Sequence, residues 1–471
     1  MRTIKVLLLL VLLLPATGCK WISAVHHGRR VNSEKFINHI DLSSANILAT
    51  IISSDSRRVA YMTKVGEKWF VVVNGREEKS YDGIDMLNSD FSPDSRRMAY
   101  VAQVGKKRVV VVDGKEDKSY DKVGKIIFSP DSQRVGYAVQ SGDKWSVVVD
   151  GKEGKFYDVE LSSPIIRPWE PIFSPDSRRV AYVSTRGEKW FVVLDNKEEK
   201  PYDVNALGGL IFSPDSRHVA YVTMTFEKCS VVVDGNKEKS YDGAGADLIF
   251  SPDSHRVAYE AMEGKKRFVV VDGKEGKTYD GFDEKTLKFS PDSQRVAYVA
   301  KVGEKRLVVV DGREEKPYDG IDGLIFSPDS RRLTYVAFDG GKRFVVLDGK
   351  EEKSYDGIGD IVFSPDSKRM AYATRVGKKW LVVVDSKEGK LYDNINQMSL
   401  VFSPDSKQVA YSAEAGGEMY VVVNDKEGKP YNRIRGAIVF DSANEFHYVA
   451  QNNTAKNGKS YDVVLVEETI N

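Results

Sequence analysis

The sequence predicts an all-β protein made of about eleven copies of one four-stranded unit, and three observations lead to this expectation. The pentapeptide Phe-Ser-Pro-Asp-Ser occurs nine times, at intervals of 37 to 45 residues, with one worn copy before the series and one after it. Short apolar runs alternate with turn residues after each copy. No segment shows the 3.6-residue period of an amphipathic helix. The units begin near Ile52, Phe91, Phe128, Phe173, Phe212, Phe250, Phe289, Phe326, Phe363, Phe402 and Phe440.

The unit that starts near Phe289 shows how each element is expected to form. Residues 287–289 are a short apolar strand, and Ser-Pro-Asp-Ser is a turn because Pro presets φ and the Ser and Asp side chains bind nearby amides. A second strand over 295–301 leads through a Gly-containing turn into a third. The Asp-Gly pair that follows is a hairpin signal. The expected second, third and fourth strands cover 295–301, 306–310 and 316–319.

The third strand decides how the units are arranged. Val-Val-Val or Val-Val-Leu recurs there without polar alternation, so both faces of the strand must be buried. A small sheet meets that condition when it stands between two similar sheets, as in a β-propeller. The fourth strand is instead introduced by runs such as Lys-Glu-Glu-Lys, and charges on an outermost strand block pairing with other edges.

The repeat also resembles a known family. Phe-Ser-Pro-Asp-Ser-Arg-Arg-Val-Ala-Tyr followed by Val-Val-Val-Asp-Gly is similar to the repeat of TolB-like and WD-repeat-like bacterial propellers, whose usual core is Phe-Ser-Pro-Asp-Gly-Lys-x-Ile-Ala-Phe. The resemblance covers residues 47–466 and implies four-stranded blades with protein-interaction surfaces. It extends neither to the N-terminal domain of TolB nor to the peptidase domain of related propellers. It therefore implies a fold and no particular activity.

The ends of the array predict how it closes. Residues 34–41 echo residues 315–322 and form a lone fourth strand, whereas the last unit ends with its third strand near 461–467. The N-terminal strand is expected to complete the last blade, which makes 34–471 one repeat array. Propeller rings usually have 4–8 blades, so two rings are preferred to one large ring of about eleven, although the uniform spacing favours one ring.

The first residues predict export. Residues 1–18 have a positive start, an apolar run over 6–14 and a small-residue cleavage region, and the run is too short to cross a bilayer. Ala-Thr-Gly-Cys resembles a lipobox, which implies acylation of Cys19 and a lipid-anchored tether over 19–33. Ordinary cleavage after Gly18 would instead give a secreted protein with a spare thiol. Lys20 implies the outer membrane, facing the periplasm, in a Gram-negative cell.

Composition and motifs argue against several functions. With a formal charge of +1, the chain has no strong positive field that would attract nucleic acid. No nucleophile elbow, P-loop, His-Glu-x-x-His or Cys-x-x-Cys motif occurs, so we expect no enzyme, no catalytic residue, no metal and no cofactor. An Asp follows the fourth-strand Tyr in nearly every unit. These carboxylates could bind cations, but capping of loop amides in every blade is the favoured interpretation.

The expected function is therefore non-catalytic binding of a protein partner in the cell envelope, with the membrane contacted through Cys19. Spacing inside the units is fixed, so all length variation falls in the connections from fourth to first strands, and that face of the propeller is the candidate binding face. Binding of a carbohydrate or cell-wall glycan is the alternative, and an enzyme with a funnel site is less favoured. The candidate contact residues are Arg167, Trp169 and Glu170 in the longest connection, and Phe226 in an unusual loop tip.

Overall fold

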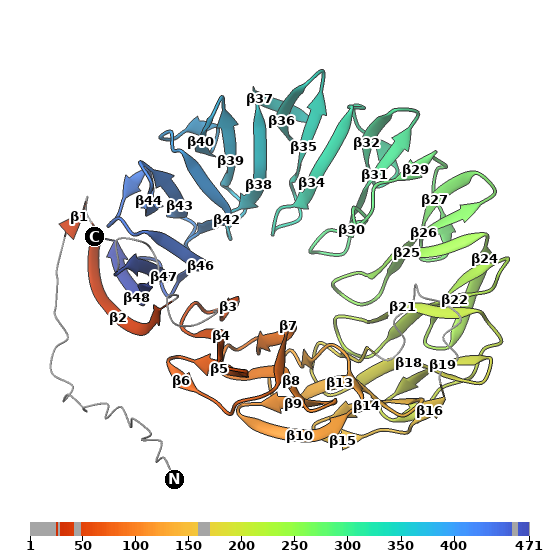
Figure 1. Ribbon diagram of the computed structural model, residues 1–471. Coiled ribbons are helices and arrows are strands. Elements are labelled where there is room, and N and C mark those ends of the chain that lie inside the picture. Colours follow the sequence, from red (N-terminus) through yellow and green to blue (C-terminus); the bar gives the residue numbers. More distant parts are fainter. Residues whose placement is uncertain (1–24, 27–28, 42–48, 159–169, 455–459, 471) are drawn as a thin grey trace, which may run out of the picture.

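Eleven antiparallel sheets stand side by side in a single ring (Figure 1). The computed structural model describes residues 25–26, 29–41, 49–158, 170–454 and 460–470, and in these residues all regular secondary structure is β. None of the described segments forms a helix with the length and apolar character needed to cross a membrane. We number the sheets as blades 1 to 11 in chain order, with the junction between two blades written as 1/2, 2/3 and so on.

Blades 1 to 4 contain the strands β3 (Ala49–Ile52), β4 (Val59–Val65), β5 (Lys68–Val73) and β6 (Arg76–Glu77); β7 (Gly83–Phe91), β8 (Met98–Val104), β9 (Lys107–Val112) and β10 (Lys115–Tyr120); β11 (Lys122–Val123), β12 (Ile127–Phe128), β13 (Val135–Ser141), β14 (Lys144–Val149), β15 (Lys152–Glu153) and β16 (Tyr157–Asp158); and β17 (Ile172–Phe173), β18 (Val180–Arg186), β19 (Lys189–Leu194) and β20 (Lys197–Glu198).

Blades 5 to 8 contain β21 (Ala206–Phe212), β22 (Val219–Met224), β23 (Cys229–Val233) and β24 (Asn236–Tyr241); β25 (Gly243–Phe250), β26 (Val257–Glu263), β27 (Lys266–Val271) and β28 (Lys274–Glu275); β29 (Gly281–Phe282), β30 (Lys288–Phe289), β31 (Val296–Val302), β32 (Lys305–Val310) and β33 (Arg313–Glu314); and β34 (Gly320–Phe326), β35 (Leu333–Asp339), β36 (Lys342–Leu347) and β37 (Lys350–Tyr355).

Blades 9 to 11 contain β38 (Gly357–Phe363), β39 (Met370–Val376), β40 (Lys379–Val384) and β41 (Lys387–Glu388); β42 (Asn394–Phe402), β43 (Val409–Ala415), β44 (Glu418–Val423) and β45 (Lys426–Glu427); and β46 (Arg433–Phe440), β47 (Glu445–Asn453) and β48 (Ser460–Ile470), joined by β2 (Arg29–Asp41) and β1 (Val25–His26).

Burial of the valine runs holds the blades together. The first strand of each blade lies toward the inside of the ring and the fourth toward the outside (Figure 1). Val109, Val110 and Val111 of the third strand in blade 2 are at most 3% exposed, because one face packs on each neighbouring blade. Eleven apolar clusters form in this way, one at each junction. The predicted all-β propeller of about eleven blades is confirmed.

The preference for two rings was wrong. Blade 11 packs on blade 1 through a cluster that includes Val59 and Val449. Hydrogen bonds also cross this closing junction, among them one from the Ser56 hydroxyl to the Ala437 carbonyl at 3.0 Å and one between His447 Nε2 and the Asp55 carbonyl at 2.6 Å. Two rings were expected because propellers usually have 4–8 blades, and eleven lies outside that range. The closing junction has an apolar cluster like those at the other ten junctions, so the eleven blades form one continuous ring.

The strand expected over 34–41 lies in β2, which pairs antiparallel with β48 as the outer strand of blade 11 (Figure 1). It starts at Arg29, because β48 continues to Ile470 and offers an edge for the earlier residues. Part of the segment expected as a tether is therefore a strand. Glu34 accepts hydrogen bonds from Lys429 and from the Tyr431 hydroxyl, each at 2.6 Å, and so acts like the fourth-strand glutamates of other blades.

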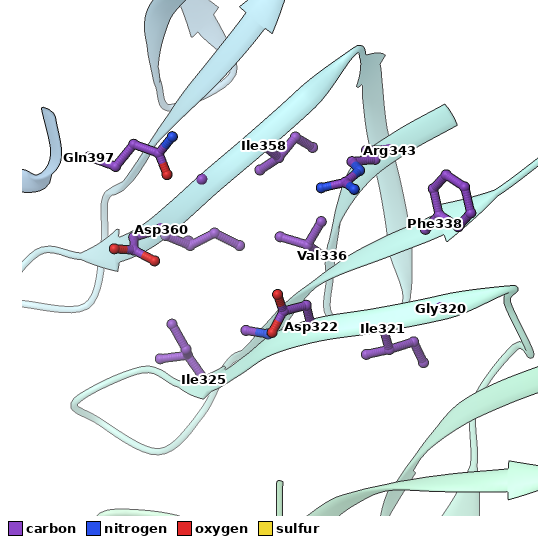
Figure 2. Close-up of a pocket in the computed structure, with 13 residues that line it drawn as sticks. Gly320, Ile321, Asp322, Ile325, Val336, Phe338, Arg343, Ile358, Asp360 and Gln397 are labelled. Carbon is purple, nitrogen blue, oxygen red and sulfur yellow. The ribbon is translucent and has the colours of Figure 1, made fainter. Parts of the chain in front are cut away.

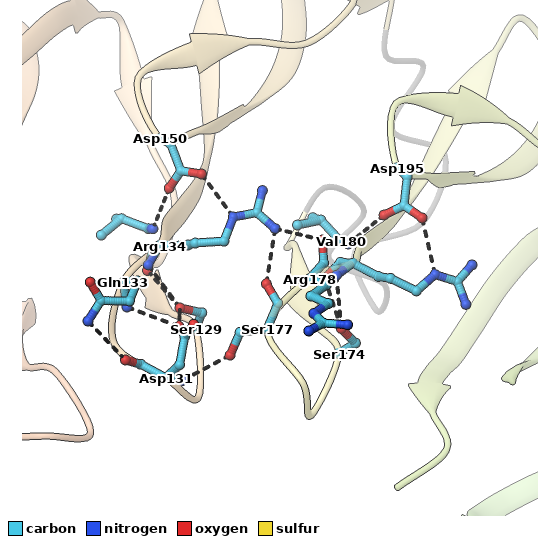
Figure 3. Close-up of polar contacts among 12 residues, drawn as sticks. Ser129, Asp131, Gln133, Arg134, Asp150, Ser174, Ser177, Arg178, Val180 and Asp195 are labelled. Atoms are coloured by element: carbon cyan, nitrogen blue, oxygen red, sulfur yellow. Dashed lines mark hydrogen bonds and ion pairs between the residues drawn. The ribbon is translucent and has the colours of Figure 1, made fainter. Parts of the chain in front are cut away.

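The repeated pentapeptide forms a turn that also reaches the next blade. In blade 3 the Ser129 hydroxyl donates to the Asp131 carboxylate at 2.6 Å and accepts the Arg134 amide at 2.9 Å (Figure 3). The Asp131 amide donates to the Ser177 hydroxyl of blade 4 at 2.9 Å. Ser177 has a φ of 65°, a conformation in which Gly is more common. Serine is suited to this position because its hydroxyl links two blades.

An arginine at the start of the second strand clamps the same junction. Arg134 donates to Asp150 of its own blade at 2.9 Å and to the Ser177 and Arg178 carbonyls of the next blade at 3.1 and 3.0 Å (Figure 3). Its guanidinium also lies 5.2 Å from the Phe173 ring centroid, within range for a cation–π contact. We call this arrangement the arginine clamp. It recurs at most junctions, with the arginines Arg97, Arg179, Arg256, Arg295 and Arg369.

Arg134→Ala is expected to lower the free energy of unfolding by about 2–3 kcal/mol, because charge-assisted hydrogen bonds to two carbonyls and a ring contact are lost. Chemical denaturation of the full chain measures the change. Arg178→Ala is the control, since its side chain is exposed and its change should stay below about 0.5 kcal/mol. Equal losses in the two variants would show that the clamp does not hold the junction.

Candidate binding site

The aspartates after the fourth-strand tyrosines cap loops of the next blade. In seven cases the carboxylate accepts the amide of the glycine in the next blade's loop between second and third strands, at 2.6 to 2.9 Å. Hydrogen bonding to Lys107, and then to the Gly142 amide, lowers the pKa of Asp121. The capping interpretation is confirmed. The capping aspartates are Asp82, Asp121, Asp242, Asp280, Asp319, Asp356 and Asp393.

Junctions 3/4 and 4/5 depart from this pattern, because neither Asp158, whose side chain is 75% exposed, nor Asp203 accepts a glycine amide of the next blade. Asp203 has no amide to cap, and its side chain is 82% exposed. The reason lies in the loop of blade 5, where the sequence Met-Thr-Phe-Glu replaces the glycine-containing tip. Thr225 closes this loop on itself, because its amide and its hydroxyl both donate to the Lys228 carbonyl, at 2.8 and 2.9 Å. The closed tip leaves Phe226 94% exposed.

The outer rim changes at the same junction. At nine junctions a lysine of one blade pairs with a glutamate of the next at 2.5 to 3.1 Å: Lys79–Glu116, Lys118–Glu153, Lys155–Glu198, Lys239–Glu275, Lys277–Glu314, Lys316–Glu351, Lys353–Glu388, Lys390–Glu427 and Lys429–Glu34. Blade 5 has Lys237 at the glutamate position, which cannot pair with Lys200 of blade 4. A hydrogen bond of 2.9 Å between the Tyr202 and Tyr221 hydroxyls joins the blades there instead.

A groove of about 950 Å³ opens between blades 4 and 5 on the face that carries the variable connections. Trp190, 7% exposed, lies in its wall, and the exposed Phe226 stands at its mouth. Thr185 also lines the groove; it is 4% exposed, and its hydroxyl is buried without a hydrogen-bond partner. Leaving such a group unpaired costs about 1–3 kcal/mol. We call this cavity the 4/5 groove; its residues are Thr185, Gly187, Glu188, Trp190, Asp203, Val204, Asn205, Ala206, Thr225, Phe226 and Glu227.

The sequence singled out one residue of this groove. Phe226 lies in it, whereas Glu170 lies near Lys125 of blade 3, with 4.0 Å between Nζ and Oε1, and does not line the groove. Arg167, Trp169 and Cys19 lie outside the described residues. Sequence reasoning missed Asp203 and Trp190, because each stands at a position that every unit fills. The absence of glycine from the loop tip of blade 5 could have indicated that Asp203 has no amide to cap.

A second cavity, of about 520 Å³, lies between blades 8 and 9 on the inner side of the ring. Figure 2 shows Asp322 and Asp360 beside this opening, with Gln397 reaching it from blade 10. A Cβ at Gly359 would meet Gln397 Oε1 at 2.1 Å, so the Gln397 side chain lies close over the backbone of Gly359 and would have to move if a larger residue stood there. The charged residues of this cavity, Asp322, Arg343 and Asp360, are exposed, and the cavity offers no buried group that lacks a partner.

Junction 6/7 contains a partly buried acid. Glu260 occupies the position of Val101 and Val183 in other blades, and burial, followed by repulsion from Asp247, raises its pKa to about 7. One carboxylate oxygen of Asp247 is buried without a hydrogen-bond partner. Nearby, Asp283 is held by Lys301 at 2.9 Å and Arg306 at 3.0 Å. Across the described residues, no three or more His, Cys, Asp or Glu side chains are grouped so that they could hold a metal ion.

Comparison with known proteins finds distant similarity to solved structures. No family model and no curated protein matches the chain. Solved structures similar to it include a eukaryotic initiation factor, with 13% identity, a TM-score of 0.40, and coverage of 72% of this chain and 97% of that one. The β-propeller domain of the trilobed protease of Pyrococcus furiosus has 12% identity and a TM-score of 0.28, with 57% and 94% covered. TolB of Acinetobacter baumannii has 13% identity and a TM-score of 0.25, with 61% and 76% covered.

Glu260→Val is expected to stabilise the protein above neutral pH. The folded-state pKa lies above the ordinary value, so the folded protein retains a proton that the unfolded chain has lost, and stability falls as pH rises through about 7. After allowance for solvent screening, the gain at pH 8 is on the order of 1–2 kcal/mol, and it should be smaller at pH 5. Denaturation at both pH values measures the difference. The exposed-residue control, Glu304→Val, should show no pH dependence; a pH-independent gain in Glu260→Val would refute the assignment.

Proposed function

We propose that the protein is a non-catalytic binding or scaffold protein, whose rigid ring presents the 4/5 groove to a protein partner. One observation carries this proposal. Among the junctions that join consecutive blades from 1 to 11 in the described residues, 4/5 is where both the aspartate cap and the rim ion pair are missing. The groups that would couple the blades there, Asp203 and the loop of Phe226, face solvent instead.

The chemistry of the groove suits a protein surface. Large aromatic side chains are enriched among the residues that contribute most to protein interfaces, and an exposed phenylalanine beside a tryptophan-lined cavity is such an arrangement. The walls belong to blades fixed by the apolar cluster of Val183, Val192 and Leu207 among others, and by the Arg179 clamp. A partner would therefore order few groups of this protein when it binds, which lowers the entropic cost of association.

We also propose that the protein is exported and held in the cell envelope by a lipid on Cys19, at the outer membrane facing the periplasm if the cell is Gram-negative. The charged start, the short apolar run and the Ala-Thr-Gly-Cys sequence support this proposal. Because β2 lies on the outside of the ring in blade 11, the chain would leave the propeller at its outer edge on the way to the anchor (Figure 1).

A photocrosslinking amino acid at position 226 is expected to yield a discrete protein adduct in cells that produce the protein naturally. The matched control is the same amino acid at position 304, an exposed residue in the equivalent loop of blade 7, where the aspartate cap is intact. Gel shift and mass spectrometry of the adducts give the result. No adduct at 226, or the same adducts at both positions, would contradict the proposal, and binding of the purified protein on a glycan array would favour the carbohydrate alternative.

Cys19→Ala is expected to abolish incorporation of an alkyne-labelled fatty acid and to move the protein from the membrane to the soluble fraction. The mass of the mature N-terminus provides the second measurement. Its control is Cys229→Ala, because Cys229 lies within a propeller strand and its loss should leave labelling unchanged. An unmodified mature N-terminus with a free thiol would indicate ordinary cleavage after Gly18 and remove the anchor.

A further inference from the structure

We propose that the 4/5 groove binds a basic peptide segment, in which a lysine or arginine side chain lies against Phe226 between the carboxylates of Glu188, Asp203 and Glu227. This inference rests on the proposed function, because it names the chemistry of the partner at the same site. Three features of the groove carry it: an unbalanced negative charge, an aromatic surface beside that charge, and a buried hydroxyl without a partner.

Neighbouring cations neutralise only part of the charge of the groove. Glu188 and Glu227 are exposed, and neither forms an ion pair within the described residues. Lys228, next to the loop tip, is bound to Asp242 at 2.8 Å and to Glu263 at 3.1 Å, so its charge is used on the other side of blade 5. Arg186 is bound to Glu198 at 2.7 Å.

Among the described residues, one cation in the loops that line the groove lies near a groove carboxylate. It is Lys189, whose Nζ is 3.6 Å from Asp203 Oδ1. An ion pair of that length between exposed groups contributes little, so it can be exchanged for a pair with a partner at small cost. The groove therefore offers three carboxylates to a ligand, and a basic segment is the complementary occupant.

The aromatic surface favours a side chain over a free cation. A lysine or arginine side chain can lay its methylene groups on Phe226 while its charged end contacts the carboxylates, and a cation near an aromatic face adds about 0.5–1 kcal/mol at exposed sites. A volume of about 950 Å³ lies at the upper end of common ligand cavities, so there is room for several peptide residues. The Thr185 hydroxyl, which is 4% exposed and unpaired, can bind a donor or acceptor of that peptide.

Another cavity on the same face provides a contrast. The cavity at junction 10/11, of about 500 Å³, is lined by Arg433 and Arg435 as well as Glu414. The cap at that junction is intact, since Asn432 accepts the Asn453 amide at 2.7 Å. Exposed aromatic area and uncompensated negative charge are therefore combined at the 4/5 groove, and not at this cavity.

The test measures binding of three labelled nonapeptides to the full chain by fluorescence anisotropy. The peptides share the same leucines and glycines and carry two arginines, two glutamines or two glutamates. The arginine peptide is expected to bind at least tenfold more tightly than the glutamine peptide at low salt and to weaken as salt rises. The glutamate peptide is expected not to bind. Equal binding of the arginine and glutamine peptides would overturn the inference.

Two double variants separate the groove from overall charge. E188K/E227K is expected to weaken arginine-peptide binding at least tenfold, whereas E67K/E304K makes the same change in net charge at exposed loop tips of other blades and should change affinity less than twofold. Equal losses would show a general charge effect and overturn the inference. Thermal unfolding of both variants verifies that they fold.

Crosslinking from position 226 distinguishes failure of this inference from failure of the proposed function. If the cellular adduct forms in the native protein and persists in E188K/E227K, the groove binds a protein without using these charges, so the inference fails while the proposed function stands. If no adduct forms in the native protein, the proposed function itself fails. Loss of the adduct in E188K/E227K, with retention in E67K/E304K, supports both.

Discussion

The ring depends on one interaction repeated from blade to blade: the pentapeptide turn and arginine of one blade bind the corresponding turn and phenylalanine of the next. The arginine satisfies carbonyls that the next turn exposes, and the second serine accepts an amide from the preceding turn. Each blade thus depends on its immediate neighbours, as in other repeat proteins. Three blades lack the arginine, because His218, Gln408 and Phe446 stand at its position in blades 5, 10 and 11. His218 binds Asp234 and Gln408 binds Asn424 within their own blades.

Repetition also explains where a binding surface can arise. In most blades the aspartates of the variable face cap loop amides and pair with lysines, as Asp121 does with the Gly142 amide and Lys107, so little of that face is available to a ligand. At junction 4/5 the changed sequence of the blade 5 loop removes the amide that Asp203 would cap. Lys237 replaces the glutamate that would pair with Lys200, so the rim pair is missing as well. The 4/5 groove therefore arises from missing couplings between blades rather than from an added structural element. The turns and arginine clamp on the opposite face are intact at this junction and keep its walls in place.

Much of the fold could be predicted from local patterns, but the site could be predicted only in part. The valine runs required burial on both faces, and the repeated aspartates required a common structural role. Phe226 was recognised because its loop differs from its equivalents. Asp203 looked like the other capping aspartates, because its loss of a partner is caused by a loop 22 residues further along the chain. Glu260 was not singled out, since its pKa depends on Asp247 and on the packing of blade 7.

The sequence by itself determined the number of strands in the unit, its turns, its buried faces and the N-terminal strand that fills the last blade. The expected limits of the fourth strand, 316–319, were wrong, because β33 covers Arg313–Glu314 and Tyr318 forms only an isolated bridge to Arg306. The turns and buried faces follow from hydrogen bonding and burial within about 40 residues, whereas the N-terminal strand was recognised because its sequence resembles the fourth strand of other units, although it pairs with β48 at the other end of the chain. Only the tertiary structure decided that eleven units form one ring and that Trp190, Asp203 and Phe226 meet at one groove. Ring size is the sum of many small rotations between blades, and each rotation is set by contacts between side chains of different units. A modest change per junction, which no single repeat reveals, would give a different ring.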